Sequence, residues 1–274
     1  MVHSTPLNEL DLVATSAADD AAFVAIHDVA ALMDRRGLER ALLIGGHMVS
    51  LHARRWGLDL FRETQDADLG VPQLTLNTVD VVPAFDALGY SRVRPNRFAK
   101  SILAVPMDKD SDPGDGQAVV DILVPALTSH PRKNVEVGGV TTIEVPGLAE
   151  ALNRPPTVIT LKLTRRNGTV LTASVKIPDE RSALILKTMA WDVRRAGKDA
   201  VDVWRCLEVA YAAGLTPHDM GSNDGARAIT ILENSFGSEK SEGVVALATT
   251  QRLHAREMTE WATRIRALAA RLRA

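Results

Sequence analysis

The spacing of apolar and polar positions changes character near residue 178. Before that point, short apolar runs of strand length alternate with helical patterns and are bounded by glycine or proline. Beyond Pro178, apolar positions recur with a helical period to the end of the chain. The pattern predicts an α/β (α+β) domain over residues 1–178, followed by a helical domain over residues 179–274.

Individual elements follow from the same pattern. In the first domain, Gly45-Gly46 separates a predicted strand from a predicted helix, and Asn167-Gly168 between two β-prone runs predicts a hairpin over 157–177. The predicted helices are 21–37, 47–56, 79–89, 181–196, 199–214, 224–236 and 243–273, and the other predicted strands are 41–44, 66–71, 92–105 and 118–125.

Composition limits the classes of function. Apolar residues make up 46% and charged residues 24%, as in ordinary globular proteins, and the formal net charge is −2. A polyanionic partner would therefore have to meet a local basic patch. The single cysteine, Cys206, excludes an internal disulfide and a cysteine-rich zinc site. No secretory signal is visible and no apolar run reaches the ~18 residues that span a bilayer, so we expect a cytoplasmic protein with no membrane association.

Three aspartates are the candidate catalytic residues of the first domain. Asp66 and Asp68 lie two residues apart on a predicted strand, so their side chains point to the same face and repel unless a cation lies between them. Asp121 lies within the apolar run VVDILV, where a bare carboxylate costs several kcal/mol unless it is paired. If the two strands are neighbours, the three carboxylates converge and suit Mg²⁺.

The alternative is that the D-x-D pair is a solvated strand end and that Asp121 is a satisfied structural residue. The glycine pair favours a catalytic site over this structural alternative. Gly45 and Gly46 between a strand and a helix would let backbone N–H groups approach phosphates, and the start of the helix would add a favourable dipole. A glycine turn, a carboxylate pair and an isolated strand carboxylate in that order predict a phosphoryl-transfer site.

The segment LLIGGHMVSLHARRWGLDLFRETQDADLGV resembles the start of the polymerase-β-like nucleotidyltransferase fold. It is most similar to the AbiEii-type abortive-infection and MenT-type toxins, whose pattern is an apolar strand, GG or GS, a helix and then R-x-[TS]-x-D-x-D-L. The matching residues are Gly45, Gly46, Arg62, Thr64, Asp66, Asp68 and Leu69. The resemblance implies a core with a mixed sheet and makes Asp121 the third carboxylate.

A second segment, LILKTMAWDVRRAGKDAVDVWRCLEV, resembles the downstream helical motif of that family. Lys187, Arg194 and Lys198 are seven and eleven residues apart, which predicts a common face if they share one helix. By resemblance, that face would hold a nucleoside triphosphate. The alternative is a solvated face, with Asp199 capping a new helix after Gly197.

The resemblance implies a Mg²⁺-dependent nucleotidyltransferase that transfers NMP from an NTP to an acceptor hydroxyl. Asp66, Asp68 and Asp121 would be catalytic and hold the metal, while Gly45, Gly46, Arg62, Lys187, Arg194 and Lys198 would bind the nucleotide. The implied acceptor is the 3′ end of tRNA, and the implied partner is a cognate antitoxin of a toxin–antitoxin system.

Two other functions stay open at this point. The first is nucleotidylation of a small molecule such as an aminoglycoside, for which the acidic run Asp108–Asp115 would line the acceptor pocket. The second is a non-catalytic binding protein that keeps the fold. The arginines of the last predicted helix, Arg252, Arg256, Arg264 and Arg271, form either a track for an RNA backbone or a solvated face.

Overall fold

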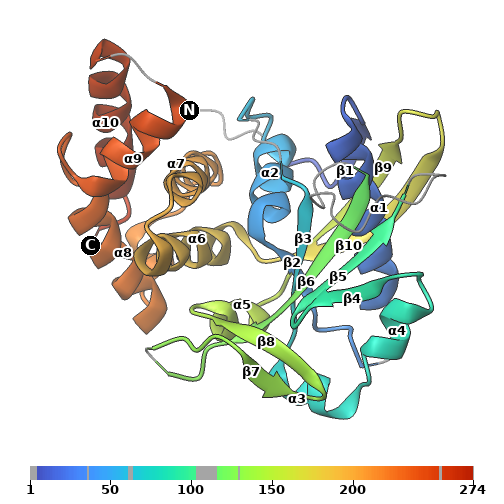
Figure 1. Cartoon of the computed structure of the whole chain (residues 1–274). Helices are drawn as coiled ribbons and strands as arrows, with labels where there is room; N and C mark the ends of the chain where they lie inside the picture. Colours follow the sequence, from blue (N-terminus) through green and yellow to red (C-terminus); the bar gives the residue numbers. More distant parts are fainter. Residues whose placement is uncertain are drawn as a thin grey trace. The chain divides into compact units, whose positions relative to one another are not determined.

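The computed structural model describes residues 5–35, 37–60, 64–102, 116–128, 130–252 and 255–273 (Figure 1). These residues form a mixed α/β protein with mixed sheets, followed by a C-terminal run of helices, α6 to α10. The chain divides into two compact units. We call Leu7–Leu51 with Phe61–Pro178 the sheet unit, and Met1–Pro6 with His52–Leu60 and Asp179–Ala274 the helical unit.

Two sheets build the sheet unit. The larger has the order β2-β3-β6-β5-β4, with β8 pairing both β6 and β7, and the smaller has the order β1-β9-β10. Within the larger sheet, β3 and β6 are parallel whereas β5 and β6 are antiparallel. The strands are β1 (Glu9–Val13), β2 (Leu42–Ile44), β3 (Asp66–Gly70), β4 (Ser91–Arg94), β5 (Arg97–Ser101), β6 (Gln117–Pro125), β7 (Val135–Val137), β8 (Val140–Val145), β9 (Thr157–Thr164) and β10 (Val170–Ile177).

The first helix of the sheet unit contacts both sheets. It begins at a capping box in which Ser16 accepts from the Asp19 backbone N–H and Asp19 accepts from the Ser16 backbone N–H. It packs against β3 and β6 of one sheet and β10 of the other. The helices that begin in this unit are α1 (Ala17–Met33), α2 (Gly45–Arg55), α3 (Gln73–Thr78), α4 (Val82–Asp86) and α5 (Leu148–Leu152).

Alternation along the central strands separates an apolar face from a charged one. Ala67 and Leu69 on β3 and Val120 and Ile122 on β6 are buried, and so is Phe98 on β5. Because successive strand residues point to opposite faces, the residues between them share the other face. The sheet therefore has one wholly apolar face, and on the other it presents Asp68, Asp121 and Arg97 beside the buried Val119 and Ala99.

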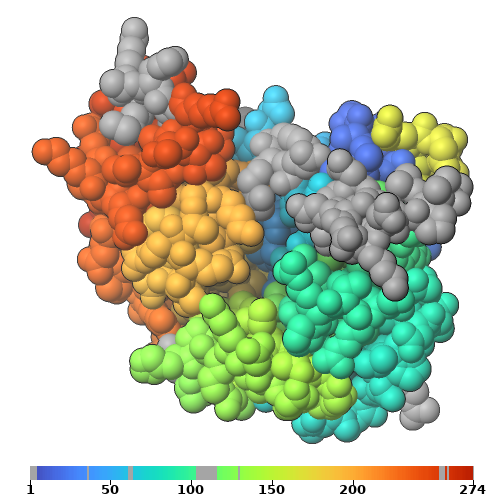
Figure 2. Space-filling model, in the orientation of Figure 1, coloured from blue at the N-terminus to red at the C-terminus, as the bar shows by residue number. Residues whose placement is uncertain are grey.

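The α3 segment and the β7–β8 hairpin lie side by side on the surface of the sheet unit (Figure 2). The Gly138 backbone N–H donates to Asn77 Oδ1 at 3.2 Å and ties the hairpin turn to the end of α3. Leu76 on α3 is buried under this contact. These segments extend the sheet unit beyond its central strands.

The helical unit packs around large apolar side chains. Trp191 and Phe236 are both fully buried, with ring centroids 5.5 Å apart. Cys206 is buried in the same unit. The elements of this unit are α6 (Glu180–Arg194), α7 (Gly197–Ala212), η1 (Pro217–Met220), α8 (Asn223–Phe236), α9 (Glu242–Gln251) and α10 (Ala255–Ala270), together with the last turn of α2.

Most predicted elements are present, with shifted ends. The Asn167-Gly168 hairpin is confirmed by the antiparallel pairing of β9 and β10. The helix predicted over 47–56 begins two residues earlier, at Gly45, and the one predicted over 79–89 shortens to α4.

The single helix predicted over 243–273 is wrong. Arg252 takes a left-handed conformation with φ of 53° after α9, and its backbone N–H caps that helix. No glycine or proline marks this break in the sequence. In the described ranges, no helix is both long and apolar enough to cross a bilayer.

Candidate functional site

Three neighbouring strands of the sheet unit place charged side chains in one row. Asp68 on β3 lies directly across from Asp121 on β6, and Asp121 lies directly across from Arg97 on β5. Residues paired across adjacent strands point to the same face of a sheet. The sequence-based expectation that the strands of Asp66/Asp68 and of Asp121 are neighbours is confirmed. We call Asp66, Asp68, Asp121 and Arg97 the charged row.

The Arg97 guanidinium lies between two of the carboxylates. Its Nη2 donates to Asp66 Oδ2 at 2.6 Å and to Asp121 Oδ2 at 2.7 Å, and its Nε donates to Asp121 Oδ1 at 2.9 Å. These hydrogen bonds, those to Asp121 above all, raise the pKa of Arg97 above its usual range even though desolvation lowers it. The charge required between the carboxylates is thus supplied by a side chain of the same sheet.

The charged row is dehydrated in part but remains open to solvent. The side chain of Asp121 is 12% exposed, that of Arg97 20% and that of Asp66 39%. Asn96 Nδ2 adds a weaker hydrogen bond to Asp121 Oδ1 at 3.3 Å. The row therefore combines partly buried carboxylates with access for a dissolved cation.

The glycine turn lies directly on Asp68. Gly45 has a φ of 73°, a conformation that glycine adopts without strain, and a Cβ added there would lie 1.8 Å from Asp68 Oδ2. Gly45 is also the first residue of α2, so the positive end of the helix dipole is close to this carboxylate. Glycine is therefore favoured at position 45 for two reasons, the left-handed backbone conformation and the close approach of Asp68.

The donor set of the row is compatible with Mg²⁺. Two carboxylates already direct their oxygens at one guanidinium, which stands in for a cation, and oxygen-only ligands are those that Mg²⁺ prefers. In the described part of the chain, no group of three or more His, Cys, Asp or Glu side chains is arranged to hold a metal ion. A metal bound by all three aspartates therefore stays a prediction.

Two features expected from the sequence lie outside the described residues. Arg62, the first residue of the R-x-[TS]-x-D-x-D-L pattern, is one of them, and the acidic run Asp108–Asp115 is the other. Thr64 is described and is partly buried just before β3.

Lys187, Arg194 and Lys198 do not share a helix face, contrary to the prediction. The first two lie on α6, which ends at Arg194, whereas Lys198 lies on α7. A left-handed residue, Arg195, with φ of 50°, separates the two helices. A new helix does follow, but it begins at Gly197 with Ala196 as its N-cap residue and no side-chain cap, so Asp199 is not the cap that the alternative expected. The turn at Arg195 breaks the periodicity that the spacing argument required.

The surroundings of these three residues also differ. Lys187 is buried, and its Nζ donates to Asp202 Oδ2 at 2.8 Å. Arg194 is half exposed and donates from Nε to Asp199 at 2.9 Å, whereas Lys198 is exposed. The prediction from sequence spacing thus grouped one buried cation, Lys187, with two surface cations, Arg194 and Lys198.

Sequence reasoning missed Arg97. The predicted strand over 92–105 contained it, but nothing in RPNRFAK marks the residue as a partner of aspartates 24 and 31 positions away. The available signal was the isolated carboxylate of Asp121, which needs a cationic partner when it is buried. That signal does not identify which residue is the partner. Only the antiparallel register of β5 and β6 identifies the donor.

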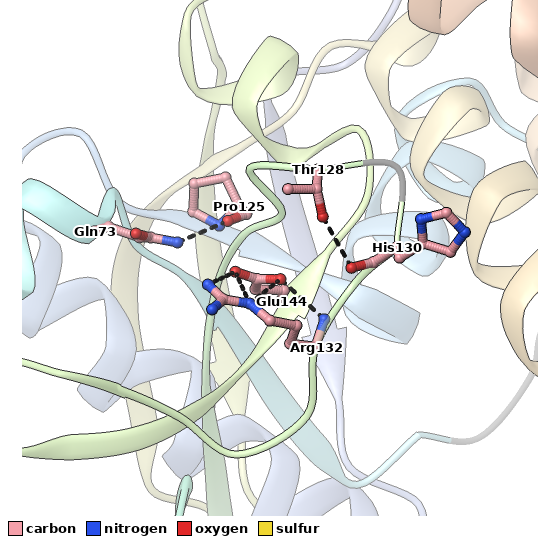
Figure 3. Close-up of polar contacts among 6 residues, drawn as sticks. All are labelled: Gln73, Pro125, Thr128, His130, Arg132 and Glu144. Carbon is pink, nitrogen blue, oxygen red and sulfur yellow. Dashed lines mark hydrogen bonds and ion pairs between the residues drawn. The ribbon is translucent and has the colours of Figure 1, made fainter.

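A second buried carboxylate of the sheet unit has a structural role (Figure 3). Glu144 on β8 accepts from Arg132 Nη2 at 2.7 Å and from the Arg132 backbone N–H at 2.8 Å. These hydrogen bonds hold the pKa of Glu144 below its usual range, although burial opposes the shift. Nearby, Gln73 Nε2 donates to the Pro125 carbonyl at 3.0 Å. The first contact fixes the segment before β7 to β8, and the second fixes the start of α3 to the end of β6.

Comparisons with known proteins add no family. No protein-family model matches the chain. No curated protein matches it significantly.

Proposed function

We propose that the chain is a Mg²⁺-dependent nucleotidyltransferase of the AbiEii/MenT type with a polymerase-β-like core. The proposal depends chiefly on the charged row. Three aspartates from two segments of the chain lie on one face of adjacent strands, and the glycine turn at the start of α2 adjoins Asp68. Paired carboxylates next to a glycine turn are the parts that phosphoryl transfer from an NTP requires.

In the proposed reaction, the acceptor hydroxyl oxygen bonds to the α-phosphorus of the NTP. The bond from that phosphorus to the α–β bridging oxygen breaks, and pyrophosphate leaves. Asp66, Asp68 and Asp121 would hold the metal, and Asp121 would also accept the proton of the attacking hydroxyl, directly or through the metal. When bound, Mg²⁺ neutralises the triphosphate charge and stabilises the leaving pyrophosphate.

The residues proposed for nucleotide binding have different roles. Backbone N–H groups of Gly45 and Gly46 approach the phosphates at the start of α2. Arg194 and Lys198, on the surface of the helical unit, are the candidates there for the triphosphate charge. Lys187 has an indirect role in nucleotide binding. Its ion pair with Asp202 orders α6 against α7, the helices that carry Arg194 and Lys198.

The tRNA 3′ end remains the proposed acceptor, and a cognate antitoxin remains the proposed partner. Arg264 and Arg271, two of the four arginines predicted as a track for an RNA backbone, both lie over the Tyr211 ring, and Arg264 also donates to Glu208. Their guanidinium groups are therefore held in place on the surface of the helical unit, where a phosphate backbone can reach them. Arg256 lies outside the residues whose side chains are described.

The decisive experiment is transfer of label from each α-³²P-labelled NTP to total tRNA in the presence of Mg²⁺. We expect labelled tRNA with the unmodified chain and none above background with Asp68→Ala, whose circular dichroism should be unchanged. Asp11→Asn, an exposed aspartate on β1, is the matched control and should keep full activity. Transfer by the Asp68→Ala variant at the unmodified rate would refute the proposal.

One observation favours a second function, a non-catalytic binding protein that keeps the fold. Arg97 already pairs with Asp66 and Asp121, as a purely structural ion pair would. Calorimetry with Mg²⁺ and NTP separates the two functions, because a binding protein of this second kind would take up neither ligand. The small-molecule alternative has no comparable support, since its acidic loop lies outside the described residues.

A further inference from the structure

The contacts of Arg97 reuse the oxygens that the proposed function assigns to a metal. Its guanidinium binds both oxygens of Asp121 and Oδ2 of Asp66. A divalent ion on the same carboxylates needs those lone pairs, and like charges cannot occupy one position. Arg97 and a metal are therefore alternatives at these atoms.

We propose that Arg97 is an intramolecular competitor of the divalent ion. In the metal-free chain, the guanidinium bridges Asp66 and Asp121. It thereby offsets the repulsion between the two carboxylates. Metal binding withdraws these hydrogen bonds and releases Arg97 towards solvent or towards a phosphate of the nucleotide. This inference depends on the metal site of the proposed function and specifies what controls its occupancy.

The exposure of the row makes such an exchange feasible. Arg97 is 20% exposed, so the released guanidinium recovers hydration, which offsets the loss of its hydrogen bonds. The long arginine side chain reaches the carboxylates from β5, and its backbone position need not change when the head group moves.

The inference has a measurable consequence for affinity. Metal binding must replace charge-assisted hydrogen bonds, which are stronger than hydrogen bonds between neutral groups. Removing the guanidinium lifts that cost, so a variant without it should bind the ion at least about tenfold more tightly. The competition thus sets a threshold concentration of metal. Below it, Arg97 stays bound to Asp66 and Asp121 and the metal site is not occupied.

The test is calorimetric titration of the full chain with Mn²⁺ and with Mg²⁺, in the absence of nucleotide. We expect Arg97→Gln to bind both ions about tenfold or more tightly than the unmodified chain, and Arg97→Lys to fall between them. Arg92→Gln is the matched control, because it removes one positive charge from the same hairpin while Arg92 donates to backbone carbonyls. Its affinity should change less than about twofold.

The outcomes separate this inference from the proposed function. Equal affinity of Arg97→Gln and the unmodified chain overturns the competition and leaves the metal site intact. Weaker binding by Arg97→Gln also overturns it, since Arg97 would then be supporting the ligands. Absence of binding in both proteins overturns the metal site itself and the competition with it.

A measurement on the unmodified chain covers the case in which Arg97→Gln does not fold. The Nε–H proton of Arg97, held by Asp121, should give a protected side-chain NMR signal that Arg97→Lys lacks. Addition of Mg²⁺ should raise its exchange rate with solvent by at least about tenfold. An unchanged exchange rate at saturating Mg²⁺ would show that the guanidinium stays in place and contradict the exchange.

Discussion

Two groups of buried and half-buried charges, one in each unit, differ in how open they are to solvent. In the charged row, Arg97 pairs with Asp66 and Asp121, and the Asp66 side chain is 39% exposed. In the helical unit, Lys187 and Arg205 both face Asp202, with Nζ–Oδ2 and Nη1–Oδ1 distances of 2.8 and 3.5 Å. We call these three residues the closed cluster, because none of their side chains is more than 7% exposed.

The difference indicates which group can exchange its partner. A closed cluster cannot trade an internal partner for an external ion without exposing charge to an apolar interior. Cys206, in the same interior, illustrates this point, because burial and the Asp202 charge raise the pKa of its thiol to about 12. The open row is the one suited to binding, and the closed cluster is suited to holding α6 against α7.

Breaking the closed cluster should give the largest effect on stability. Asp202→Asn removes the carboxylate that faces the buried Lys187 and Arg205, so we expect a loss of about 3–5 kcal/mol in the free energy of unfolding, measured by urea denaturation. Asp192→Asn is the control, because Asp192 pairs with Arg195 on the same unit but at the surface. That change should cost less than about 1 kcal/mol. Equal losses would remove the distinction between closed and open charge groups.

The glycine at the charged row offers a second comparison. Gly45→Ala adds left-handed strain of about 1–2 kcal/mol and also places a methyl group against Asp68. Gly57→Ala adds the same strain after the other end of α2, where nothing lies within 4 Å of the new Cβ. We expect Gly45→Ala to lower the unfolding free energy by at least about 1 kcal/mol more than Gly57→Ala. Identical losses in thermal or urea unfolding would mean that Asp68 moves aside without cost.

The Glu144–Arg132 pair should give the smallest and most pH-dependent effect. Because Arg132 holds the pKa of Glu144 below its ordinary value near 4.5, the ionised pair stabilises the fold above that pH. This stabilisation is lost as the pH falls through the lowered native-state pKa. We therefore expect Glu144→Gln to be less stable than the unmodified chain at neutral pH, with the difference shrinking towards pH 3. A difference in urea midpoints that stays constant from pH 7 to pH 3 would contradict the assigned pair.

Local patterns in the sequence predicted the elements better than the contacts between them. Asn167-Gly168 specified its hairpin because a two-residue turn fixes the pairing of the strands on either side. The change at Pro178 placed the run of helices, because helical periodicity is a local property. The breaks at Arg195 and Arg252 were not predicted, since an arginine in a left-handed conformation carries no signal in composition.

The sequence by itself determined that three aspartates on two strands needed a cation, because the cost of an unpaired or repelling carboxylate follows from its immediate neighbours. It also determined that a glycine pair would separate a strand from a helix ahead of them. Only the tertiary structure decided that Arg97 supplies that cation and that Lys187 pairs with Asp202 in the interior of the helical unit. The reason is physical: the partner of a charge is set by strand register and helix packing, which join residues far apart in the chain and leave no periodic trace in the sequence.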